Sequence, residues 1–471
     1  MANTARTEHP VKISDYRGRN IFMIGISGSS MSGLAQMLKQ KKFHVSGSSD
    51  VYTAKVKELR EKGIPVIVGH RADNVRNANL AVYTTAIPAD NPELMECRRR
   101  NIPMLDRPAL LGEIMEEYPL SAAVSGTHGK TTTTSMLAQI LLDDGMDPTI
   151  HIGGELPLIN SGVHIGNSDI FVTEACEYKR AFFDLRPKIA IVLNIDRDHL
   201  DCYKDIDEIE ETFGKFMNQV KDGGLVIGNG SDPRVVRQMR ACGAEIQTYG
   251  FDEHCDWQAR NYREDEKGYG IFELAFRDKV FGTVRMGIPG RFNTENALAA
   301  FAGAYAIGAD MSMAIYAMET FHGAKRRFEM SAVINGTELF HDYGHNPTEI
   351  RNTIAIAKKR CGSGRVWAVL QPHTYSRLRT LFDDFAACTE EADITLVTDV
   401  FLARETKPDD LNAGMLVEAM KKRGVNARWT PTFDDTEKAL VSGWKKGDLV
   451  ITLGCGNINL LNEQIKKHFG K

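Results

Sequence analysis

The chain has 471 residues, of which 42% are hydrophobic and 25% are charged, and its formal net charge is −4. A single hydrophobic core does not usually extend over such a length, so we expect about three domains of ~150 residues each. The small negative charge gives no general attraction to nucleic acid or to anionic membranes, and we expect neither as a partner.

Apolar, β-branched segments alternate with helical patterns along the chain, which predicts α/β domains with largely parallel sheets. The first unit, residues 1–119, opens with a short apolar strand, a loop of glycine and serine, and a helix. Tyr118-Pro119 marks its predicted end, because the residue before a proline rarely continues a helix. The predicted elements are strands at 21–24, 65–68 and 81–84 and helices at 32–41 and 108–117.

The second unit, residues 120–322, repeats the order of strand, loop and helix. Its first helix carries one apolar face and is followed by Gly145, a residue suited to a helix C-terminus. Residues 246–287 are rich in glycine and alternate in polarity, which predicts short antiparallel strands. The predicted elements are strands at 120–124, 170–173, 189–193 and 225–227, helices at 131–142 and 293–306, and a junction near His322.

The third unit, residues 323–471, again shows a doubly wound pattern. Its predicted strands lie at 338–341, 366–370, 394–398 and 449–453, with helices between them. We therefore expect three α/β domains. These are a Rossmann-like N-terminal domain, a central P-loop ATPase-like domain with a mostly parallel sheet, and a Rossmann-like C-terminal domain.

Targeting and redox signals are absent from the sequence pattern. Residues 1–16 are polar without an apolar signal core, and the apolar runs elsewhere are too short to span a bilayer. The eight cysteines lack the paired spacing of a metal site or of a disulfide framework. We therefore predict a reduced, cytoplasmic protein without membrane insertion, as a monomer or a weak homodimer.

A phosphate-binding loop is predicted at Ser125-Gly-Thr-His-Gly-Lys-Thr-Thr132, between a strand and a helix. Its glycines allow backbone N–H groups to converge on phosphate oxygens, and the start of the helix adds partial positive charge. Lys130 can neutralise the β- and γ-phosphates of ATP, and the hydroxyl of Thr131 can bind Mg²⁺. The spacing is shorter than the usual GxxxxGK[ST], because position 124 is valine. The predicted ATP-binding residues here are Gly126, Thr127, His128, Gly129, Lys130, Thr131 and Thr132.

Two polar residues follow neighbouring strands of the second unit. Glu174 ends one predicted strand, and His199 follows the next strand by a short loop. Parallel strands share one carboxyl edge, which also carries the phosphate loop, so both side chains can reach a nucleotide-bound Mg²⁺. A carboxylate is a usual ligand of Mg²⁺ and a histidine a less usual one. The other acids here are expected to be solvated loop charges: Glu177, Asp196, Asp198 and Asp201.

A second anion site is predicted at Gly25-Ile-Ser-Gly-Ser-Ser-Met-Ser-Gly33, which follows a strand and opens a helix. Ser27 and Ser30 break the GxGxxG fingerprint of dinucleotide-binding proteins, which disfavours an NAD-dependent dehydrogenase. The loop still suits a diphosphate, to which the two serine hydroxyls can donate.

Nine segments in order resemble the Mur ligase family and extend over nearly the whole chain. They are GISGSSMSGLAQML at 25–38, GTHGKTTTT at 126–134, EACE at 174–177, NIDRDHLD at 194–201, PGRFNTENALAA at 289–300, RRFE at 326–329, DYGHNPTE at 342–349, QPHTYSR at 371–377 and GCGNI at 454–458. The resemblance implies an ATP-dependent ligase of peptidoglycan precursor synthesis. It would join L-alanine to the lactyl carboxylate of UDP-N-acetylmuramate through an acyl phosphate, with the three units binding UDP-sugar, ATP and amino acid in turn.

The resemblance also implies roles for residues around ATP. Mg²⁺, or Mn²⁺ in its place, would be held by Thr131, Glu174 and His199. Asn293 and Asn296 would contact adenine, although Asn293 could also cap a helix. Arg327 would reach the γ-phosphate and Asp342 a ribose hydroxyl. Lys215 lies one place off the carbamylated lysine of the wider family, and we expect an ordinary surface lysine.

The other two substrates have implied sites of their own. The UDP-sugar would bind Gly25, Ser27, Gly28, Ser29, Ser30, Ser48, Asp50, His70, Thr84 and Arg107. From sequence alone, Asp50 could equally cap a helix and His70 could lie in a surface loop. The amino acid would bind Tyr343, His345, His373 and Arg377, and the fork of Arg377 suits a carboxylate. The family pattern is broken at His341, which replaces an acid, and at Asn346, which replaces a histidine.

The expected catalytic residues are Lys130, His199, Arg327 and His345, of which either histidine can take the proton of the amine. The nearest alternative function is the ligase that attaches a recycled tripeptide to UDP-N-acetylmuramate. A folate polyglutamate synthase is disfavoured because residues 1–119 would have no use in it. A nucleotide-dependent sensor without ligase activity is disfavoured by the intact set of Lys130, Glu174 and His199.

Overall fold

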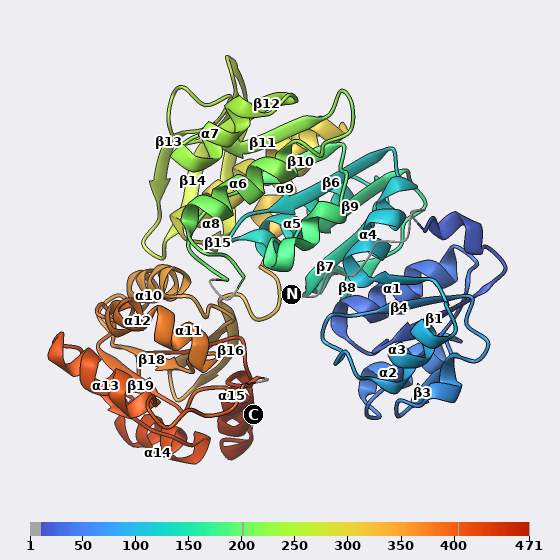
Figure 1. Ribbon diagram of the computed structural model, residues 1–471. Helices are drawn as coiled ribbons and strands as arrows, with labels where there is room; N and C mark the ends of the chain where they lie inside the picture. The colour runs from blue at the N-terminus through green and yellow to red at the C-terminus, as the bar shows by residue number, and fades with distance from the viewer. Residues whose placement is uncertain (1–10, 200–201, 404, 471) are drawn as a thin grey trace.

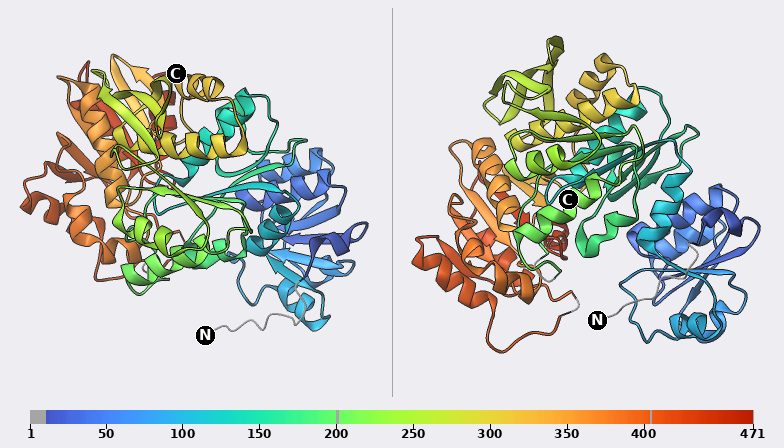
Figure 2. Two further views of the ribbon diagram at one scale, coloured as in Figure 1. Left: turned by 90° about the horizontal axis from the view of Figure 1, so that it is seen from above. Right: turned by 45° about the horizontal axis from the view of Figure 1, so that its top comes forward.

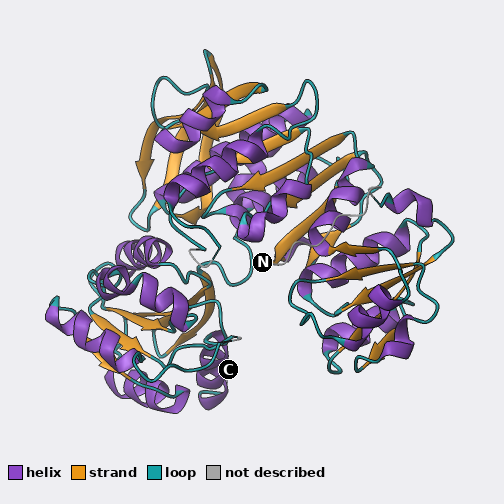
Figure 3. Cartoon of the chain, viewed as in Figure 1, coloured by secondary structure: helices purple, strands orange, loops and turns teal. Residues whose placement is uncertain are grey.

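The computed structural model describes residues 11–199, 202–403 and 405–470. They form three α/β domains, each built on its own β-sheet, and the central domain lies between the other two (Figure 1). Figure 2 shows the same order of domains from two further directions. Helices pack on the sheets of all three domains (Figure 3), as expected for strands that are buried on both faces.

The N-terminal domain contains a wholly parallel sheet in the order β3-β2-β1-β4-β5. Its central strand β1 (Asn20–Ile24) is buried through the apolar run Ile-Phe-Met-Ile. The strand order reverses between β1 and β4, so the loop after β1 lies at the switch point where such sheets bind ligands. The other elements are η1 (Ile13–Tyr16), α1 (Ser29–Gln40), β2 (His44–Ser49), α2 (Ala54–Glu61), β3 (Val66–Val68), η2 (Ala72–Val75), β4 (Leu80–Tyr83), α3 (Pro92–Arg99), β5 (Met104–Asp106) and α4 (Arg107–Glu116).

The central domain has a ten-stranded sheet in the order β15-β14-β13-β12-β11-β10-β6-β9-β7-β8. Only the pairs at its two ends, β13–β14, β14–β15 and β7–β8, are antiparallel. Strand β6 (Leu120–Ser125) lies between β10 and β9, so the phosphate loop also follows a switch point. The other elements are α5 (Lys130–Asp143), β7 (Thr149–Leu156), η3 (Pro157–Ile159), β8 (Ser161–His164), β9 (Ile170–Glu174), η4 (Tyr178–Asp184), β10 (Ile189–Val192), α6 (Ile206–Met217), β11 (Leu225–Asn229), α7 (Pro233–Ala241), β12 (Glu245–Gly250), β13 (Trp257–Glu264), β14 (Tyr269–Phe276), β15 (Lys279–Pro289), α8 (Arg291–Ile307) and α9 (Met311–Thr320).

The C-terminal domain has a six-stranded sheet in the order β16-β17-β21-β18-β19-β20, parallel except at β16–β17. Its elements are β16 (Glu329–Ile334), β17 (Thr337–Asp342), α10 (Pro347–Cys361), β18 (Val366–Leu370), α11 (Tyr375–Thr380), α12 (Phe382–Ala387), β19 (Ile394–Val397), α13 (Ala413–Lys422), β20 (Ala427–Trp429), α14 (Phe433–Gly443), β21 (Leu449–Leu453) and α15 (Asn459–His468). None of the described helices combines the length and the apolar character needed to cross a membrane.

The three-domain α/β architecture was predicted correctly, and several local predictions were wrong. The prediction of antiparallel strands over 246–287 is wrong at β12, which pairs in parallel with β11. Helix α8 begins at Arg291 and its N-cap residue is Gly290, so Asn293 lies inside the helix and does not cap it. Helix α2 is capped by the hydroxyl of Thr53 and not by Asp50.

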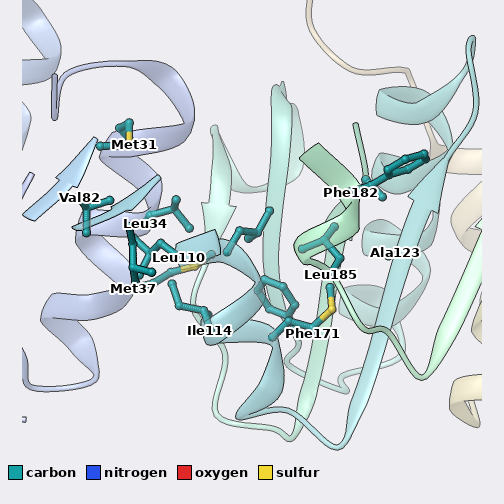
Figure 4. Close-up of a cluster of buried hydrophobic side chains, with 14 of the residues drawn as sticks. Met31, Leu34, Met37, Val82, Leu110, Ile114, Ala123, Phe171, Phe182 and Leu185 are labelled. Atoms are coloured by element: carbon teal, nitrogen blue, oxygen red, sulfur yellow. The ribbon is translucent and has the colours of Figure 1, made fainter. Parts of the chain in front are cut away.

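The two domain junctions differ in chemistry. One buried apolar cluster runs from the N-terminal domain into the central domain, where α4 residues such as Ile114 lie beside Phe171 of β9 (Figure 4). The C-terminal domain has apolar clusters of its own, and it meets the central domain through polar pairs such as Lys359–Glu264. Domain motion is the default unless an interface is large and apolar, so we expect the C-terminal domain to move and the N-terminal domain to stay fixed.

Candidate active site between the central and C-terminal domains

A cavity of about 540 Å³ lies between the central and C-terminal domains. One wall is the phosphate loop and the start of α8, and the other is the beginning of the C-terminal domain. The predicted ATP-binding residues on its lining are His128, Gly129, Thr132, Asn293, Asn296, Arg327 and Asp342. A cavity of this size is within the usual range of small-molecule sites.

Two glycines of the phosphate loop have backbone conformations that other residues rarely adopt. The φ angle is +145° at Gly126 and +87° at Gly129. A Cβ atom on Gly129 would lie 2.6 Å from Oδ1 of Asn296, so the loop and α8 approach each other closely. The loop therefore depends on glycine for its shape and for its contact with the predicted adenine site.

The ammonium group of Lys130 is buried among acceptors. It donates to the carbonyl oxygens of Gly126 and Thr127, and it lies 2.9 Å from Oε2 of Glu177. Burial is the largest single influence on the pKa of Lys130 and lowers it, but the surrounding acidic groups, Glu177 first among them, together raise the pKa above its usual value. Nε2 of His199 lies 3.5 Å from the same carboxylate. The prediction that Glu177 is a solvated charge is therefore wrong, since its side chain is 3% exposed and pairs with Lys130.

Thr131 and Glu174, two of the three predicted metal ligands, lie beside two adjacent glycines of β7. Oε1 of Glu174 accepts a hydrogen bond from the backbone N–H of Gly153. A Cβ atom on Gly154 would lie 2.8 Å from Cγ2 of Thr131, so small residues make room for both groups. The described residues contain no cluster of three or more His, Cys, Asp or Glu side chains able to hold a metal. A hydroxyl, a carboxylate and an imidazole can each donate to a divalent ion, and the assignment of Thr131, Glu174 and His199 to one ion stays a prediction.

His128 of the phosphate loop connects the two domains. Its Nε2 lies 3.0 Å from Oδ2 of Asp196, and its Nδ1 lies 3.4 Å from Oε1 of Glu349 in the C-terminal domain. Burial lowers the pKa of His128, but the two carboxylates outweigh it and raise the pKa to about 9. His128 is therefore a cation at neutral pH. Asp196 is paired and not simply solvated, contrary to the sequence prediction.

The predicted amino-acid site also bridges the domains. Nη2 of Arg377 lies 3.2 Å from Oδ1 of Asp198, and its Nη1 donates to Nδ1 of His373. The side chains of Arg377 and Asp198 are 14% and 10% exposed, so the solvated charge predicted for Asp198 is also wrong. Asp201, the fourth of these acids, lies outside the described residues.

Two histidines beside this pair are neutral near pH 7. Burial lowers the pKa of His345 to about 4, and burial with the charge of Arg377 lowers the pKa of His373 to about 4. Nδ1 of His345 lies 3.2 Å from the carbonyl oxygen of Tyr343, which can only accept, so Nδ1 carries the proton and Nε2 keeps its lone pair. The structure thus gathers Tyr343, His345, His373 and Arg377 as the resemblance implied.

The residues predicted to contact the γ-phosphate and the nucleoside differ in the protein partners that they already have. In the described part of the chain, the guanidinium of Arg327 has no carboxylate within ion-pair distance and lies over the ring of Tyr343. Asp342 already accepts hydrogen bonds from the backbone N–H groups of Phe328 and Gly344. The amide of Asn296 donates to Asn293. Their contacts with a nucleotide stay predictions.

The two departures from the family pattern have structural explanations. His341 is buried, and burial lowers its pKa to about 3, so the ring is neutral and accepts a hydrogen bond from Nε of Arg326. Asn346 caps α10 in a capping box with Glu349. Glu349, which the sequence reading left without a role, therefore serves both the helix start and the contact with His128.

The predicted UDP-sugar residues lie apart from this cavity, at the carboxyl edge of the N-terminal sheet. The buried carboxylate of Glu93 lies 2.7 Å from Oγ of Ser48 and 2.6 Å from Nδ1 of His70, and Nε2 of His70 lies 2.6 Å from Asp50. His70 is thus held by acids and is not a surface-loop residue. Glu93 is a member of this group that sequence reasoning missed, since it stands on α3, far from any recognised motif.

The rest of the predicted UDP-sugar set surrounds the loop after β1. A Cβ atom on Gly25 would lie 3.3 Å from Cγ2 of Thr84, which places Thr84 against the loop. Gly28 and Ser29 are exposed at the start of α1. Lys215, by contrast, is exposed on α6, which confirms the prediction of a surface lysine.

Comparison with known proteins defines the class of this chain. Three family models match it, the Mur ligase family catalytic domain at residues 20–119, the Mur ligase middle domain at 124–304 and the Mur ligase glutamate ligase domain at 326–456. The chain belongs to the Mur ligase family.

Two curated relatives carry the same name. The chain is 40% identical over 447 residues to UDP-N-acetylmuramate--L-alanine ligase of Clostridium botulinum (strain Okra / Type B1), with 95% of this chain and 97% of that protein covered. It is 39% identical over 452 residues to the protein of the same name from Acetivibrio thermocellus, with coverage of 95% and 96%.

Solved structures give the same fold. UDP-N-acetylmuramate-alanine ligase MurC from Thermotoga maritima matches with a TM-score of 0.80 and 25% identity, covering 96% of this chain and 99% of that chain. The murein peptide ligase mpl from Psychrobacter arcticus matches with a TM-score of 0.71 and 26% identity, with the same coverage.

Proposed function

We propose that this protein is an ATP-dependent UDP-N-acetylmuramate–L-alanine ligase that acts in cytoplasmic peptidoglycan precursor synthesis. The observation that carries the proposal is the ion pair between Arg377 and Asp198 beside the phosphate loop. A guanidinium from the C-terminal domain thereby binds a carboxylate next to the phosphate-transfer groups of the central domain. The alanine carboxylate needs the same partner. The names of the relatives at about 40% identity agree with this substrate.

The first step activates the sugar acid. A lactyl carboxylate oxygen forms a bond to the γ-phosphorus of ATP, the bond to the β,γ-bridging oxygen breaks, and ADP leaves. Lys130 and Arg327 supply positive charge to the transferring phosphoryl group. Thr131, Glu174 and His199 would hold Mg²⁺ or Mn²⁺, which supplies further charge neutralisation when bound. Lys130 must exchange part of its contact with Glu177 for phosphate.

The second step forms the amide. The neutral amine of L-alanine attacks the acyl carbon, the bond from that carbon to the phosphate oxygen breaks, and inorganic phosphate leaves. Arg377 orients the alanine carboxylate, and a base takes the amine proton. His345 has an acceptor nitrogen but a pKa of about 4, so it binds a proton weakly at neutral pH. His199 is proposed above as a metal ligand, so its ring cannot also act as this base, and we propose that Nε2 of His345, whose lone pair is free, takes the proton.

Phosphate release tests the proposal. The full-length protein would be incubated with ATP, Mg²⁺ and UDP-N-acetylmuramate, and then with alanine, serine, glycine or the L-alanyl-γ-D-glutamyl-diaminopimelate tripeptide added separately. We expect release with alanine, and substitution of Mn²⁺ to support it. Release with the tripeptide alone would identify the alternative, cell-wall recycling ligase, to which the chain is also similar in fold.

We also propose the functional division of the chain. Residues 1–119 would bind the UDP-sugar, 120–322 ATP and 323–471 the amino acid. The first boundary falls between α4 and β6, and the second between α9 and β16.

A further inference from the structure

A hydrogen bond joins the N-terminal and central domains at the loop after β1. Oγ of Ser30, the second residue of α1, lies 3.0 Å from Nε2 of His151 on β7. His151 is 4% exposed. A Cβ atom on Gly33 would collide with Val163 of β8, so α1 lies directly against this edge of the central sheet. The contact belongs to a close-packed interface.

The direction of each hydrogen bond in this group follows from its neighbours. The hydroxyl of Thr173 donates to the backbone carbonyl of Glu174, so its oxygen accepts from Nδ1 of His151, 3.2 Å away. Nε2 of the neutral ring then accepts the proton of Ser30. Nη1 of Arg107 donates to the same Ser30 oxygen at 3.4 Å. Burial and the nearby charge of Arg107 lower the pKa of His151 to about 4, which keeps the ring neutral.

The two serines that break the dinucleotide fingerprint are thus held by protein groups. Oγ of Ser27 lies 2.6 Å from Oγ of Ser49, and Oγ of Ser30 is held by His151. Both hydroxyls thus have protein partners in this structure, and their donation to a diphosphate stays a prediction. Gly28 provides no side-chain cap for α1, so the first N–H groups of the helix have no side-chain partner there.

The guanidinium of Arg107 uses only one of its nitrogens, Nη1, in a hydrogen bond within the described residues. Its single hydrogen bond within the described residues is the one to Ser30, and no carboxylate there lies within ion-pair distance. Arg107 therefore keeps donors for an anion beside the start of α1, where the helix dipole also favours negative charge. The position of these donors depends on where Ser30 is fixed.

We infer that His151 is a positioning residue for the nucleotide-sugar site: through Ser30 it fixes the guanidinium of Arg107 beside the start of α1 for a diphosphate. The inference rests on the proposed function in one respect, since it takes the anion to be the diphosphate of a UDP-sugar. His151 touches no substrate in this scheme. Its action reaches the ligand only through Ser30 and Arg107, which gives the inference a specific test.

The test compares His151→Leu and Ser30→Ala with the wild-type full-length protein. Calorimetry would measure the Kd of UDP and of UDP-N-acetylmuramate, and steady-state kinetics the KM of ATP. We expect each substitution to raise both Kd values about ten-fold, as one lost hydrogen bond in a charged network can do. The KM of ATP should change less than two-fold. The double variant should bind UDP and UDP-N-acetylmuramate no more weakly than His151→Leu does, because both changes remove the same hydrogen bond between Ser30 and His151.

A cycle with Arg107 separates positioning from general stability. In an Arg107→Ala background, His151→Leu should change the Kd of UDP less than two-fold, because the group that it positions is gone. A full ten-fold loss in that background would overturn the inference, and so would unchanged affinity in both single variants. His164→Leu is the matched control, since His164 lies on the adjacent strand β8 and pairs with Asp147 inside the central domain.

Two outcomes distinguish this inference from the proposed function. Wild-type protein that binds UDP-N-acetylmuramate but releases no phosphate with alanine would refute the proposed function, and the affinity cycle would still decide the role of His151. If His151→Leu does not fold, Ser30→Ala and Ser30→Gly carry the same test, because Ser30 is only partly buried.

Nitrogen-15 NMR of labelled histidine should show His151 protonated at Nδ1, and a proton at Nε2 would contradict the assigned hydrogen-bond directions.

Discussion

Replacing Arg377 by alanine should weaken the binding of the amino acid far more than that of ATP. In the structure, Nη2 of Arg377 lies 3.2 Å from Oδ1 of Asp198, and both side chains are mostly buried. Two unit charges at that separation attract by about 5 kcal/mol at an effective dielectric constant of 20. Truncating one partner of a buried charge pair costs about 2–5 kcal/mol.

If the alanine carboxylate takes the place of Asp198 on the guanidinium, Arg377→Ala loses an interaction of that size. The KM of alanine should then rise roughly 30-fold to 4,000-fold, because about 1.4 kcal/mol corresponds to a factor of ten. Arg377→Lys should recover only part of the loss, since an ammonium group lacks the planar fork. Asp198→Asn removes the resident carboxylate but keeps the guanidinium, so the KM of alanine should not rise.

Steady-state kinetics with each of the three substrates varied in turn would measure these effects. Arg379→Ala is the matched control, because Arg379 is exposed on the same helix and pairs with Asp410. An alanine KM that stays unchanged in Arg377→Ala would remove Arg377 from the amino-acid site. A shift confined to the KM of ATP would do the same.

Three further predictions concern the phosphate loop and the metal. Lys130→Ala should abolish turnover and leave the UDP-sugar Kd within about two-fold in calorimetry, because the two proposed sites lie in different domains; parallel loss of affinity would contradict this division. Glu174→Gln should shift the Mg²⁺ and Mn²⁺ titrations of activity to higher concentration, and unchanged titrations would exclude Glu174 as a ligand. The folded-state pKa of His128 is raised from 6.5 to about 9, so its stabilisation is complete below pH 6.5 and is lost as pH rises through about 9. Urea unfolding should show a loss on the order of 3 kcal/mol across that window, and a slope that persists in His128→Asn would refute the assignment.

Much of the fold could be predicted because its signals are local. The strands at 366–370 and 449–453 were predicted with the bounds that the structure shows. Strands buried on both faces form nearly continuous apolar runs, so their ends are marked by the charged, polar or glycine residues on each side. The phosphate loop was also readable, because its glycines, Lys130 and the helix that follows are consecutive in the chain. Helix starts were harder. Helix α1 begins at Ser29, before the predicted residue 32, because serine is compatible with both a loop and a first turn.

The environment of individual charges could not be predicted in the same way. Glu177, Asp196 and Asp198 were expected to be solvated, yet the structure pairs them with Lys130, His128 and Arg377. Sequence reasoning had no means of finding these pairs, since each joins loops that follow different strands. The nearest available signal was the position of all three acids at the carboxyl edge of the sheet.

The sequence by itself determined the order of strands and helices, the phosphate loop and the family resemblance, because each depends on residues that are neighbours in the chain. The tertiary structure alone decided which charges are buried and which residues bridge the domains. Ser30 and His151 are separated by 121 positions and form a contact only after helix α1 has packed against the central sheet. The physical reason is that burial and hydrogen-bond partners depend on the packing of distant segments, whereas strand and helix patterns depend on local side-chain periodicity.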